Sequence, residues 1–262
     1  MTGMELGIEG RNAIVSGASR GMGFAAAMRL ATEGVAVTMV ARNPERLAAS
    51  AQAVRDATGV AVTEVAADIT TAAGQAAAVA ACPAPDILIT NADGPAPGDF
   101  RDLTREDWLG AIDALMLTPI ALIRMTVDGM VARRWGRIVC ISSRSVKIAQ
   151  PEMPLSNGAR SGLAGFVAGL SRQVVRHGVT INSILPGIFD TDAQKQHIEG
   201  MLASTGKSFE ALWEERRRGN PAQRYGRPEE FAAYCAFLCS EHAGFITGQN
   251  LLIDGGSYPG TF

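Results

Sequence analysis

Cysteines, aromatic residues and histidines are all scarce in this sequence, and the shortage of cysteines excludes one class of protein. Among 262 residues there are 4 cysteines and 3 histidines, and aromatic residues make up 6%. Four widely spaced cysteines cannot supply the framework of a small disulfide-stabilised domain, and none of them has the paired spacing of a zinc site. Cys235 and Cys239 stand four positions apart, so they share one face of a helix. We expect them in the core rather than in a metal or redox site.

An excess of charge is also missing. The chain has 24 lysines and arginines against 26 acidic residues, a net charge of −2. Proteins that bind nucleic acid through its phosphates carry a strongly basic surface. A nucleic-acid partner is therefore not expected.

No long hydrophobic run suggests export or a membrane span. The longest uncharged stretch, residues 69–85, consists mainly of Ala, Thr and Gly and includes two prolines. Acidic Glu5 and Glu9 precede the first apolar run, which is the wrong order for a signal peptide. We expect a cytoplasmic protein with no membrane partner.

What is present is an alternation of short β-branched runs with Ala-rich helical stretches. The apolar share of 47% is enough for a full core. The expected strands are residues 11–16, 35–41, 60–66, 86–90, 136–142, 179–185 and 249–253, each a continuous apolar run typical of a strand buried on both faces. Asn43 before Pro44, and Thr104 three residues before Asp107, read as helix N-caps. The alternation predicts a doubly wound parallel α/β sheet, Rossmann-like, in one domain over residues 1–262.

Residues 190–228 interrupt this alternation with helical pieces and no strand. Ligands of open α/β sheets bind outside the carboxyl ends of the strands, and this segment follows the sixth expected strand. We interpret it as a helical substrate lid rather than a structural excursion. Arg216, Arg217 and Arg218 near its end read as a solvated helix terminus rather than a phosphate clamp.

A glycine-rich stretch, residues 16–23, follows the first expected strand and opens a helix. Glycines allow a tight turn close to a pyrophosphate, and the free amides at the helix start favour its negative charge. The second strand ends at Arg42, with no acidic residue to bind a ribose hydroxyl, and Arg20 offers a second guanidinium. Two guanidiniums suit a 2′-phosphate, so the sequence favours NADP(H) over NAD(H).

Together these motifs resemble the short-chain dehydrogenase/reductase (SDR) family, and its 3-oxoacyl-acyl-carrier-protein-reductase-like members in particular. The resemblance runs from about Gly10 to Gly256 and includes Asp68, Thr90-Asn91-Ala92, Ser142-Ser143, Pro186-Gly187 with Thr191, Ile246-Thr247-Gly248-Gln249 and Asp254-Gly255-Gly256. It implies pyrophosphate and ribose contacts by Gly17, Ser19, Arg20, Met22 and Gly23, adenine contacts by Asp68 and Ile69, a cofactor channel lined by Asn91 and Ala92, and nicotinamide contacts by Pro186, Gly187 and Thr191. It also implies a homodimer or homotetramer.

The same resemblance identifies four catalytic positions. In the family a Ser polarises the substrate carbonyl, a Tyr passes the proton, a Lys lowers the pKa of that Tyr, and an upstream Asn completes a water relay. Here Ser143 occupies the first position, while the other three hold Ser156, Arg160 and Leu115. A serine is a much weaker acid than a tyrosine, and arginine keeps its proton, so Arg160 is expected to act as an electrostatic clamp.

Other polar residues near these motifs have competing interpretations. Asp93 stands where the family usually has Gly, and could repel phosphate, accept a substrate proton or simply face solvent. Tyr258 and Lys147 are candidate substitute proton donors, although both also suit an ordinary surface position. His177 and His197 have no recognisable partner in the sequence, and we interpret them as structural.

Three functions are consistent with this pattern. The leading hypothesis is an NADP(H)-dependent oxidoreductase acting on a carbonyl or alcohol, with an atypical proton path through water, Ser156 or Lys147. The second is an NADP(H)-binding sensor or partner subunit without redox turnover, and the third is a lyase or isomerase that uses Arg160. The apolar lid, with Arg144, Lys147 and Arg160 nearby, hints at a small-molecule substrate that is anionic and has an apolar body.

Overall fold

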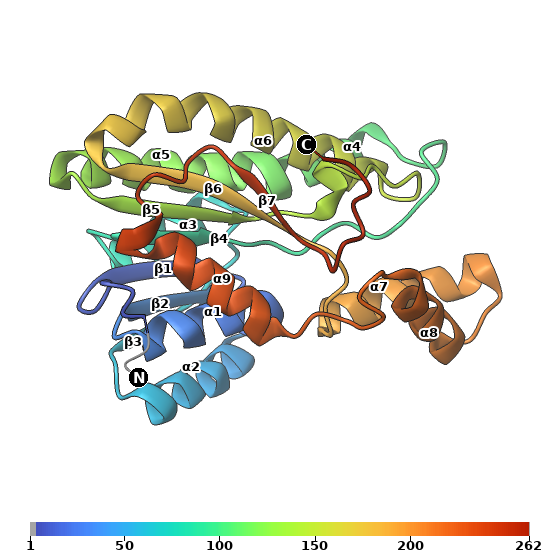
Figure 1. Ribbon diagram of the computed structural model, residues 1–262, viewed down its shortest axis with the longest axis horizontal. Coiled ribbons are helices and arrows are strands. Elements are labelled where there is room, and N and C mark those ends of the chain that lie inside the picture. Colours follow the sequence, from blue (N-terminus) through green and yellow to red (C-terminus); the bar gives the residue numbers. More distant parts are fainter. Residues whose placement is uncertain (1–3, 262) are drawn as a thin grey trace.

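A single parallel sheet of seven strands organises the computed structural model, which describes residues 4–261 (Figure 1). The strand order is β3-β2-β1-β4-β5-β6-β7. The strands are β1 Asn12–Ser16, β2 Ala36–Ala41, β3 Val62–Ala66, β4 Ile87–Thr90, β5 Gly136–Ile141, β6 Val179–Pro186 and β7 Asn250–Ile253. The predicted doubly wound parallel sheet is confirmed.

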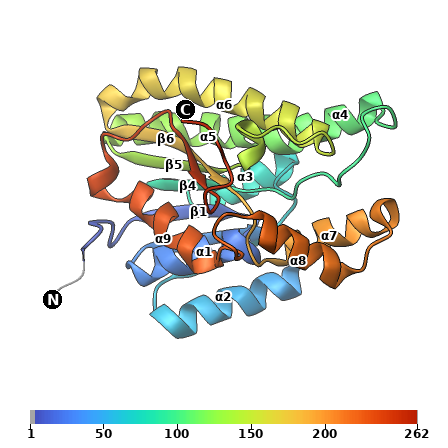
Figure 2. The same ribbon diagram turned by 45° about the vertical axis from the view of Figure 1, so that its right-hand side comes forward.

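Helices cover both faces of the sheet (Figures 1 and 2). One layer contains α1 Gly21–Thr32, α2 Pro44–Thr58 and α9 Pro228–Cys239, and the other contains α3 Ala72–Ala81, α4 Arg105–Ile112, α5 Thr118–Arg133 and α6 Pro154–Val174. Short turns are η2 Arg144–Val146, η3 Val175–His177 and η4 Glu241–Ala243. Strands buried between two helical layers require apolar side chains at successive positions, which explains their continuous β-branched runs.

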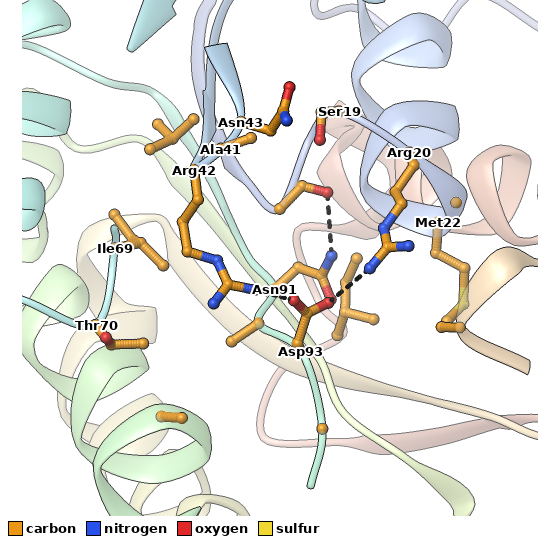
Figure 3. Close-up of a pocket in the computed structure, with 18 of the residues that line it drawn as sticks. Ser19, Arg20, Met22, Ala41, Arg42, Asn43, Ile69, Thr70, Asn91 and Asp93 are labelled. Atoms are coloured by element: carbon orange, nitrogen blue, oxygen red, sulfur yellow. Dashed lines mark hydrogen bonds and ion pairs between the residues drawn. The ribbon is translucent and has the colours of Figure 1, made fainter. Parts of the chain in front are cut away.

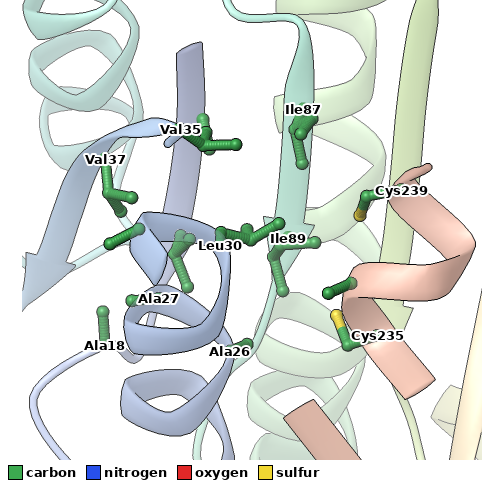
Figure 4. Close-up of a cluster of buried hydrophobic side chains, with 14 of the residues drawn as sticks. Ala18, Ala26, Ala27, Leu30, Val35, Val37, Ile87, Ile89, Cys235 and Cys239 are labelled. Atoms are coloured by element: carbon green, nitrogen blue, oxygen red, sulfur yellow. The ribbon is translucent and has the colours of Figure 1, made fainter. Parts of the chain in front are cut away.

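The core on the α1 and α9 side includes the cysteines that the sequence placed there. Cys235 and Cys239 are fully buried beside Leu30 and Ile89 (Figure 4), and both are free thiols. One expectation was too general, because β3 lies at the edge of the sheet and leaves Thr63 and Glu64 exposed. An edge strand is covered less completely than its neighbours, which accounts for the difference.

The helix starts follow the predicted capping chemistry. The Asn43 side chain accepts a hydrogen bond from the amide of Arg46, 2.7 Å away, with Pro44 at the first helical position. At α4, Thr104 and Asp107 form a reciprocal capping box, with donor–acceptor distances of 2.8 and 3.2 Å. Both N-caps are confirmed.

Residues 105–133 form one continuous helical stretch in which η1, Asp113–Leu117, is a π-helical segment between α4 and α5. By length and composition alone this stretch is apolar enough to cross a bilayer, and it is the one helix in residues 4–261 of which this is true. It packs against α3, α6 and β5, and Leu122, Ile123 and Met130 are fully buried. Its apolar composition is thus explained by its place over the sheet.

The segment 190–228 forms α7 Asp192–Thr205 and α8 Phe209–Gly219, which project from the body beyond the carboxyl ends of the strands (Figure 1). Strand order reverses between β1 and β4, so the helices leaving these strands go to opposite faces. A crevice opens at such a switch point and is the usual ligand site of doubly wound sheets.

Candidate functional site

A cavity of about 350 Å³ occupies the crevice at the switch point. It is lined by most of the residues that the sequence assigned to the cofactor, namely Gly17, Ser19, Arg20, Met22, Arg42, Asp68, Ile69, Asn91, Ala92 and Thr191. Pro186 and Gly187 line a second, adjoining cavity. Gly23 is the exception, because it packs behind the lining.

The glycine loop has a backbone that larger residues would disturb. Gly17 has a φ of +61°, in the left-handed region that favours glycine. A Cβ at Gly23 would collide with the carbonyl oxygen of Gly17, so this glycine lets α1 approach the loop closely. No side chain caps the start of α1. Gly21 and Met22, at this start, line the cavity, and the free amides of a helix start favour an anion.

Asn91 ties the end of β4 to the end of β1. The Ser16 hydroxyl donates to the Asn91 carbonyl oxygen at 2.7 Å and accepts from the Asn91 amide at 2.8 Å. The Asn91 side-chain amide donates to the carbonyl oxygen of Gly17 at 3.4 Å (Figure 3). These bonds fix the floor of the cavity at the point where the two strands diverge.

Asp93 lies between the two arginines that the sequence assigned to a 2′-phosphate (Figure 3). It forms a hydrogen-bonded ion pair with Arg42 and lies 3.7 Å from Arg20. Asp93 is exposed to solvent, as one of its interpretations expected, but it also has these two cationic neighbours. Its carboxylate draws both guanidiniums to one place at the edge of the cavity.

The predicted adenine and nicotinamide ends are also ordered by short-range hydrogen bonds. Asp68 accepts from the amide and hydroxyl of Thr70, at 3.0 and 2.8 Å, and these bonds hold the pKa of Asp68 below its usual value. Thr191 caps α7 by accepting from the amide of Gln194 at 3.2 Å, and it lines both cavities.

The second cavity, of about 420 Å³, adjoins the first and extends to α7 and α8. Arg20, Asp93, Ser142, Arg160 and Thr191 line both cavities, which makes them neighbouring parts of one site. Ser143 and Ser156 line the second cavity. The structure thus brings together all three residues to which the sequence assigned catalytic roles.

Arg160 is held at the junction of the two cavities. Its Nε donates to the Ser156 hydroxyl at 3.2 Å, and its Nη1 donates to the carbonyl oxygen of Ile141 at 3.1 Å. Burial lowers the pKa of Arg160 to about 10, so the group is still a cation at neutral pH. It has no carboxylate partner among residues 4–261. The guanidinium is a fixed positive charge beside a space large enough for a ligand.

The hydroxyls around Arg160 are arranged differently from one another. Ser143 accepts from the amide of Ser145 at 3.1 Å and thereby caps η2. Ser156 accepts from Arg160, so its own hydrogen is available to another acceptor, and the hydroxyl of Ser145 lies 3.5 Å away. Leu115, at the expected relay position, is 3% exposed within the π-helical segment. Its side chain offers no hydrogen bond to a relay water.

Lys147 and Tyr258, the two candidate substitute donors, lie near each other. The Lys147 ammonium is 5.6 Å from the centroid of the Tyr258 ring. Among the described residues that line the two cavities there is no tyrosine or lysine. A proton path through the Lys147 ammonium itself is therefore not supported by this geometry.

Two residues of the second cavity have surroundings that the sequence did not reveal. His197 lines the cavity, and its Nε2 lies 2.8 Å from Nη2 of Arg216. Arg217 and Arg218 do form a solvated terminus, paired with Glu214, but Arg216 turns into the cavity. A signal was present, because Arg216 stands four positions after the buried Leu212 and so shares its face of α8. His177 lies outside the cavities and contacts Arg176 at 3.1 Å.

Comparison with known proteins gives consistent matches over almost the whole chain. Residues 17–258 match the family described as enoyl-(acyl carrier protein) reductase. The chain is 35% identical to acetoacetyl-CoA reductase of Cupriavidus necator over 175 residues, 67% of each protein. It is 30% identical to the NADPH-dependent reductase BacG of Bacillus subtilis, covering 94% of this chain and 97% of that one. The structure of L-sorbose reductase from Gluconobacter frateurii complexed with NADPH and L-sorbose superimposes with a TM-score of 0.92 at 29% identity, covering 98% of this chain and all of the other.

Proposed function

Because the chain belongs to the short-chain dehydrogenase/reductase family, we propose that it is an NADP(H)-dependent oxidoreductase that acts on a carbonyl or alcohol through an atypical proton path. The observation that carries the cofactor assignment is the convergence of Arg20 and Arg42 on Asp93. A carboxylate already held between two guanidiniums marks a place where the phosphate of a ligand can replace it. BacG and L-sorbose reductase, which are described with NADPH, support the same choice.

The cavity fits a dinucleotide in its other parts as well. The free amides at the start of α1 would hold the pyrophosphate, and Gly23 lets this helix start lie close to the loop that contains Gly17. Asp68 and Ile69 would hold the adenine end, and Pro186, Gly187 and Thr191 would border the nicotinamide end. When bound, NADPH supplies the hydride that reduces a carbonyl.

The residues of the second cavity would handle the substrate oxygen. The guanidinium of Arg160 stabilises negative charge that develops on this oxygen, and the hydroxyl of Ser143 donates a hydrogen bond to it. Because Ser156 accepts from Arg160, it can donate its own hydrogen toward the oxygen and be reprotonated by water. Arg160 keeps its proton throughout, so it acts by charge and not by proton transfer.

The cofactor assignment is tested by titrating NADPH and NADH into the wild type and into Arg42→Ala. Loss of a charged hydrogen-bonding partner is worth about 1.5–3 kcal/mol, so we expect NADPH to bind roughly 10- to 100-fold more weakly while NADH is unchanged. Asp93→Gly removes the competing carboxylate and should tighten NADPH binding only. Arg55→Ala, in which the lost partner is Glu64 on β3, is the matched control. Unchanged NADPH affinity in Arg42→Ala rejects the assignment.

A second candidate function is an NADP(H)-binding protein without turnover. It is favoured by the absence of a tyrosine or lysine lining either cavity within residues 4–261. The two candidates predict different results when NADPH is incubated with ketones, β-oxoacyl thioesters and quinones. The oxidoreductase oxidises NADPH with at least one of them, and the loss of NADPH absorbance measures this oxidation. Tight binding without oxidation across this panel, combined with activity gained by Ser156→Tyr with Arg160→Lys, supports the second.

The cytoplasmic location and the homodimer or homotetramer stay predictions. Leu109, Leu117 and Met125, on the outer side of α4, η1 and α5, are 43%, 45% and 40% exposed. Exposed apolar side chains on one helical layer are compatible with a contact between copies of the chain.

A further inference from the structure

Two arginines enter the second cavity from opposite elements. Arg144 belongs to η2 and directly follows Ser143, while Arg216 belongs to α8 in the segment that projects beyond the sheet. Both side chains are half-buried, and burial lowers the pKa of each guanidinium. The two residues line the same cavity, and the charge of Arg144 also lowers the pKa of Arg216.

Neither arginine has an ion-pair partner within residues 4–261, whereas most arginines of α8 and the loops do. Arg217 and Arg218, the next two residues, both pair with Glu214 at 2.6 and 2.7 Å. Glu152 and Asp254 act on Arg144 only from beyond ion-pair distance. Glu152 and Glu215 likewise act on Arg216 without forming an ion pair with it. Partly buried cations with only distant carboxylates are unfavourable on their own and suit the binding of an anion between them.

The neighbours of Arg216 supply further donors. Arginine only donates hydrogen bonds, so Nε2 of His197, 2.8 Å from Arg216, must be the acceptor. His197 is therefore neutral with its proton on Nδ1, in agreement with a pKa lowered to about 4 by burial and by Arg216. The side-chain amide nitrogen of Gln194, in a residue lining the same cavity, is buried with no partner among the described residues. The surroundings of Arg216 thus add uncharged donors to the two cations.

We propose, resting on the oxidoreductase function above, that the substrate is a carbonyl compound bearing an anionic group, a carboxylate or phosphate ester, which Arg144 and Arg216 bind together. Arg160 serves the reacting oxygen, and the other two arginines serve the distal anion. Because Arg216 is carried by α8 and Arg144 by the body, the bound anion also joins the projecting helices to the rest of the site.

Binding of matched acid and neutral probes tests this proposal without turnover. Acetoacetate, 3-oxohexanoate and 3-oxooctanoate are titrated calorimetrically against their methyl esters, and dihydroxyacetone phosphate against dihydroxyacetone. The protein is saturated with NADP⁺, which cannot reduce a ketone, and the titrations are repeated without cofactor. We expect at least one anionic probe to bind about 10-fold or more tightly than its neutral counterpart, the value of one charged hydrogen-bonded contact. The two series distinguish a carboxylate from a phosphate ester.

Arg216→Gln and Arg144→Gln should each remove this preference, and Arg218→Gln is the matched control on the same helix. Thermal unfolding checks that each variant is folded, and two variants on separate elements guard against a local defect in one of them. Equal binding of acids and neutral probes throughout both series, including no binding by any acid, overturns the proposal. So does a preference that survives both substitutions. Selective anion binding without NADPH oxidation by any probe leaves this site intact and counts against the oxidoreductase function alone.

Discussion

The two cavities of this site are built in different ways. In the first, the Ser16 hydroxyl forms hydrogen bonds with the backbone carbonyl and amide of Asn91, and Arg42 has a carboxylate partner. In the second, Arg144, Arg160 and Arg216 have no carboxylate partner among residues 4–261. The groups named in the first cavity are thus paired within the protein, whereas the second cavity and its junction with the first hold three arginines that lack an ion-pair partner among these residues.

This difference indicates that the arginines of the second cavity lower the stability of the fold. Replacement of a buried ionic group by an apolar one of similar size is often neutral or stabilising, so uncompensated arginines are unfavourable for folding. Violations of ordinary packing and pairing rules concentrate at functional sites. The contrast therefore supports the proposal that the second cavity binds an anionic substrate.

The largest effect on activity is expected for Arg160→Met, which keeps the bulk of the side chain and removes its charge. Loss of one preorganised group that stabilises an oxyanion costs roughly 10²- to 10³-fold in turnover, so we expect kcat/KM to fall by that factor. The free energy of unfolding should stay the same or rise, because a desolvated cation has been removed. Steady-state kinetics and urea unfolding measure the two effects.

Arg172→Met is the control, since Arg172 is exposed on the same helix, α6. It should change neither quantity. Full activity in Arg160→Met would show that the second cavity does not depend on its central charge.

A substitution in the first cavity should behave in the opposite way, with stability and cofactor binding lost together. In Gly23→Ala the new Cβ meets the carbonyl oxygen of Gly17, a backbone atom that cannot move aside easily. Overpacking of this kind costs about 1–3 kcal/mol, and we expect a comparable loss in NADPH affinity, roughly 10-fold or more.

Gly169→Ala is the matched control, because a Cβ there meets nothing within 4 Å and α6 gains helix propensity. Urea unfolding and NADPH titration are compared for both variants. If Gly23→Ala is as stable as Gly169→Ala and binds NADPH normally, the close approach of α1 to the loop is not required.

The same contrast explains what could be predicted from the sequence. The limits of β5 and the cap at Asn43 depend on neighbouring residues, so local patterns predicted them within one or two positions. The glycine loop is also local, because its turn and the helix it opens are adjacent in the chain. Ten of the thirteen residues assigned to the cofactor line one cavity, but those outside the glycine loop and Arg42 were assigned through the family resemblance and not through local patterns.

The contacts that were missed join distant residues. Arg42 and Asp93 are 51 positions apart, and His197 and Arg216 are 19 apart on two different helices. Nothing in the sequence fixes how α7 and α8 lie against each other. The only sign that Arg216 points into the cavity was its spacing of four positions from Leu212 on the same helix. A pairing between elements depends on tertiary packing, which composition and local spacing do not specify.

The smallest expected effect concerns His197 and the pH dependence of stability, which should differ between the groups of the two cavities. Its folded pKa of about 4 lies below the ordinary value, so between pH 6.5 and 4.5 the unfolded chain binds a proton that the folded protein does not. Stability should therefore fall as the pH decreases through this range, by about 1 kcal/mol once solvent around the partly exposed ring is allowed for. Urea unfolding at pH 7.5 and 5 should show a smaller decrease in His197→Gln, whereas between pH 7.5 and 8.5 both proteins should respond alike. Asp68 in the first cavity, with its lowered pKa, acts only at more acid pH. An equally large decrease in His197→Gln would mean that His197 does not set the acid response, and the contrast between the two cavities would rest on catalysis alone.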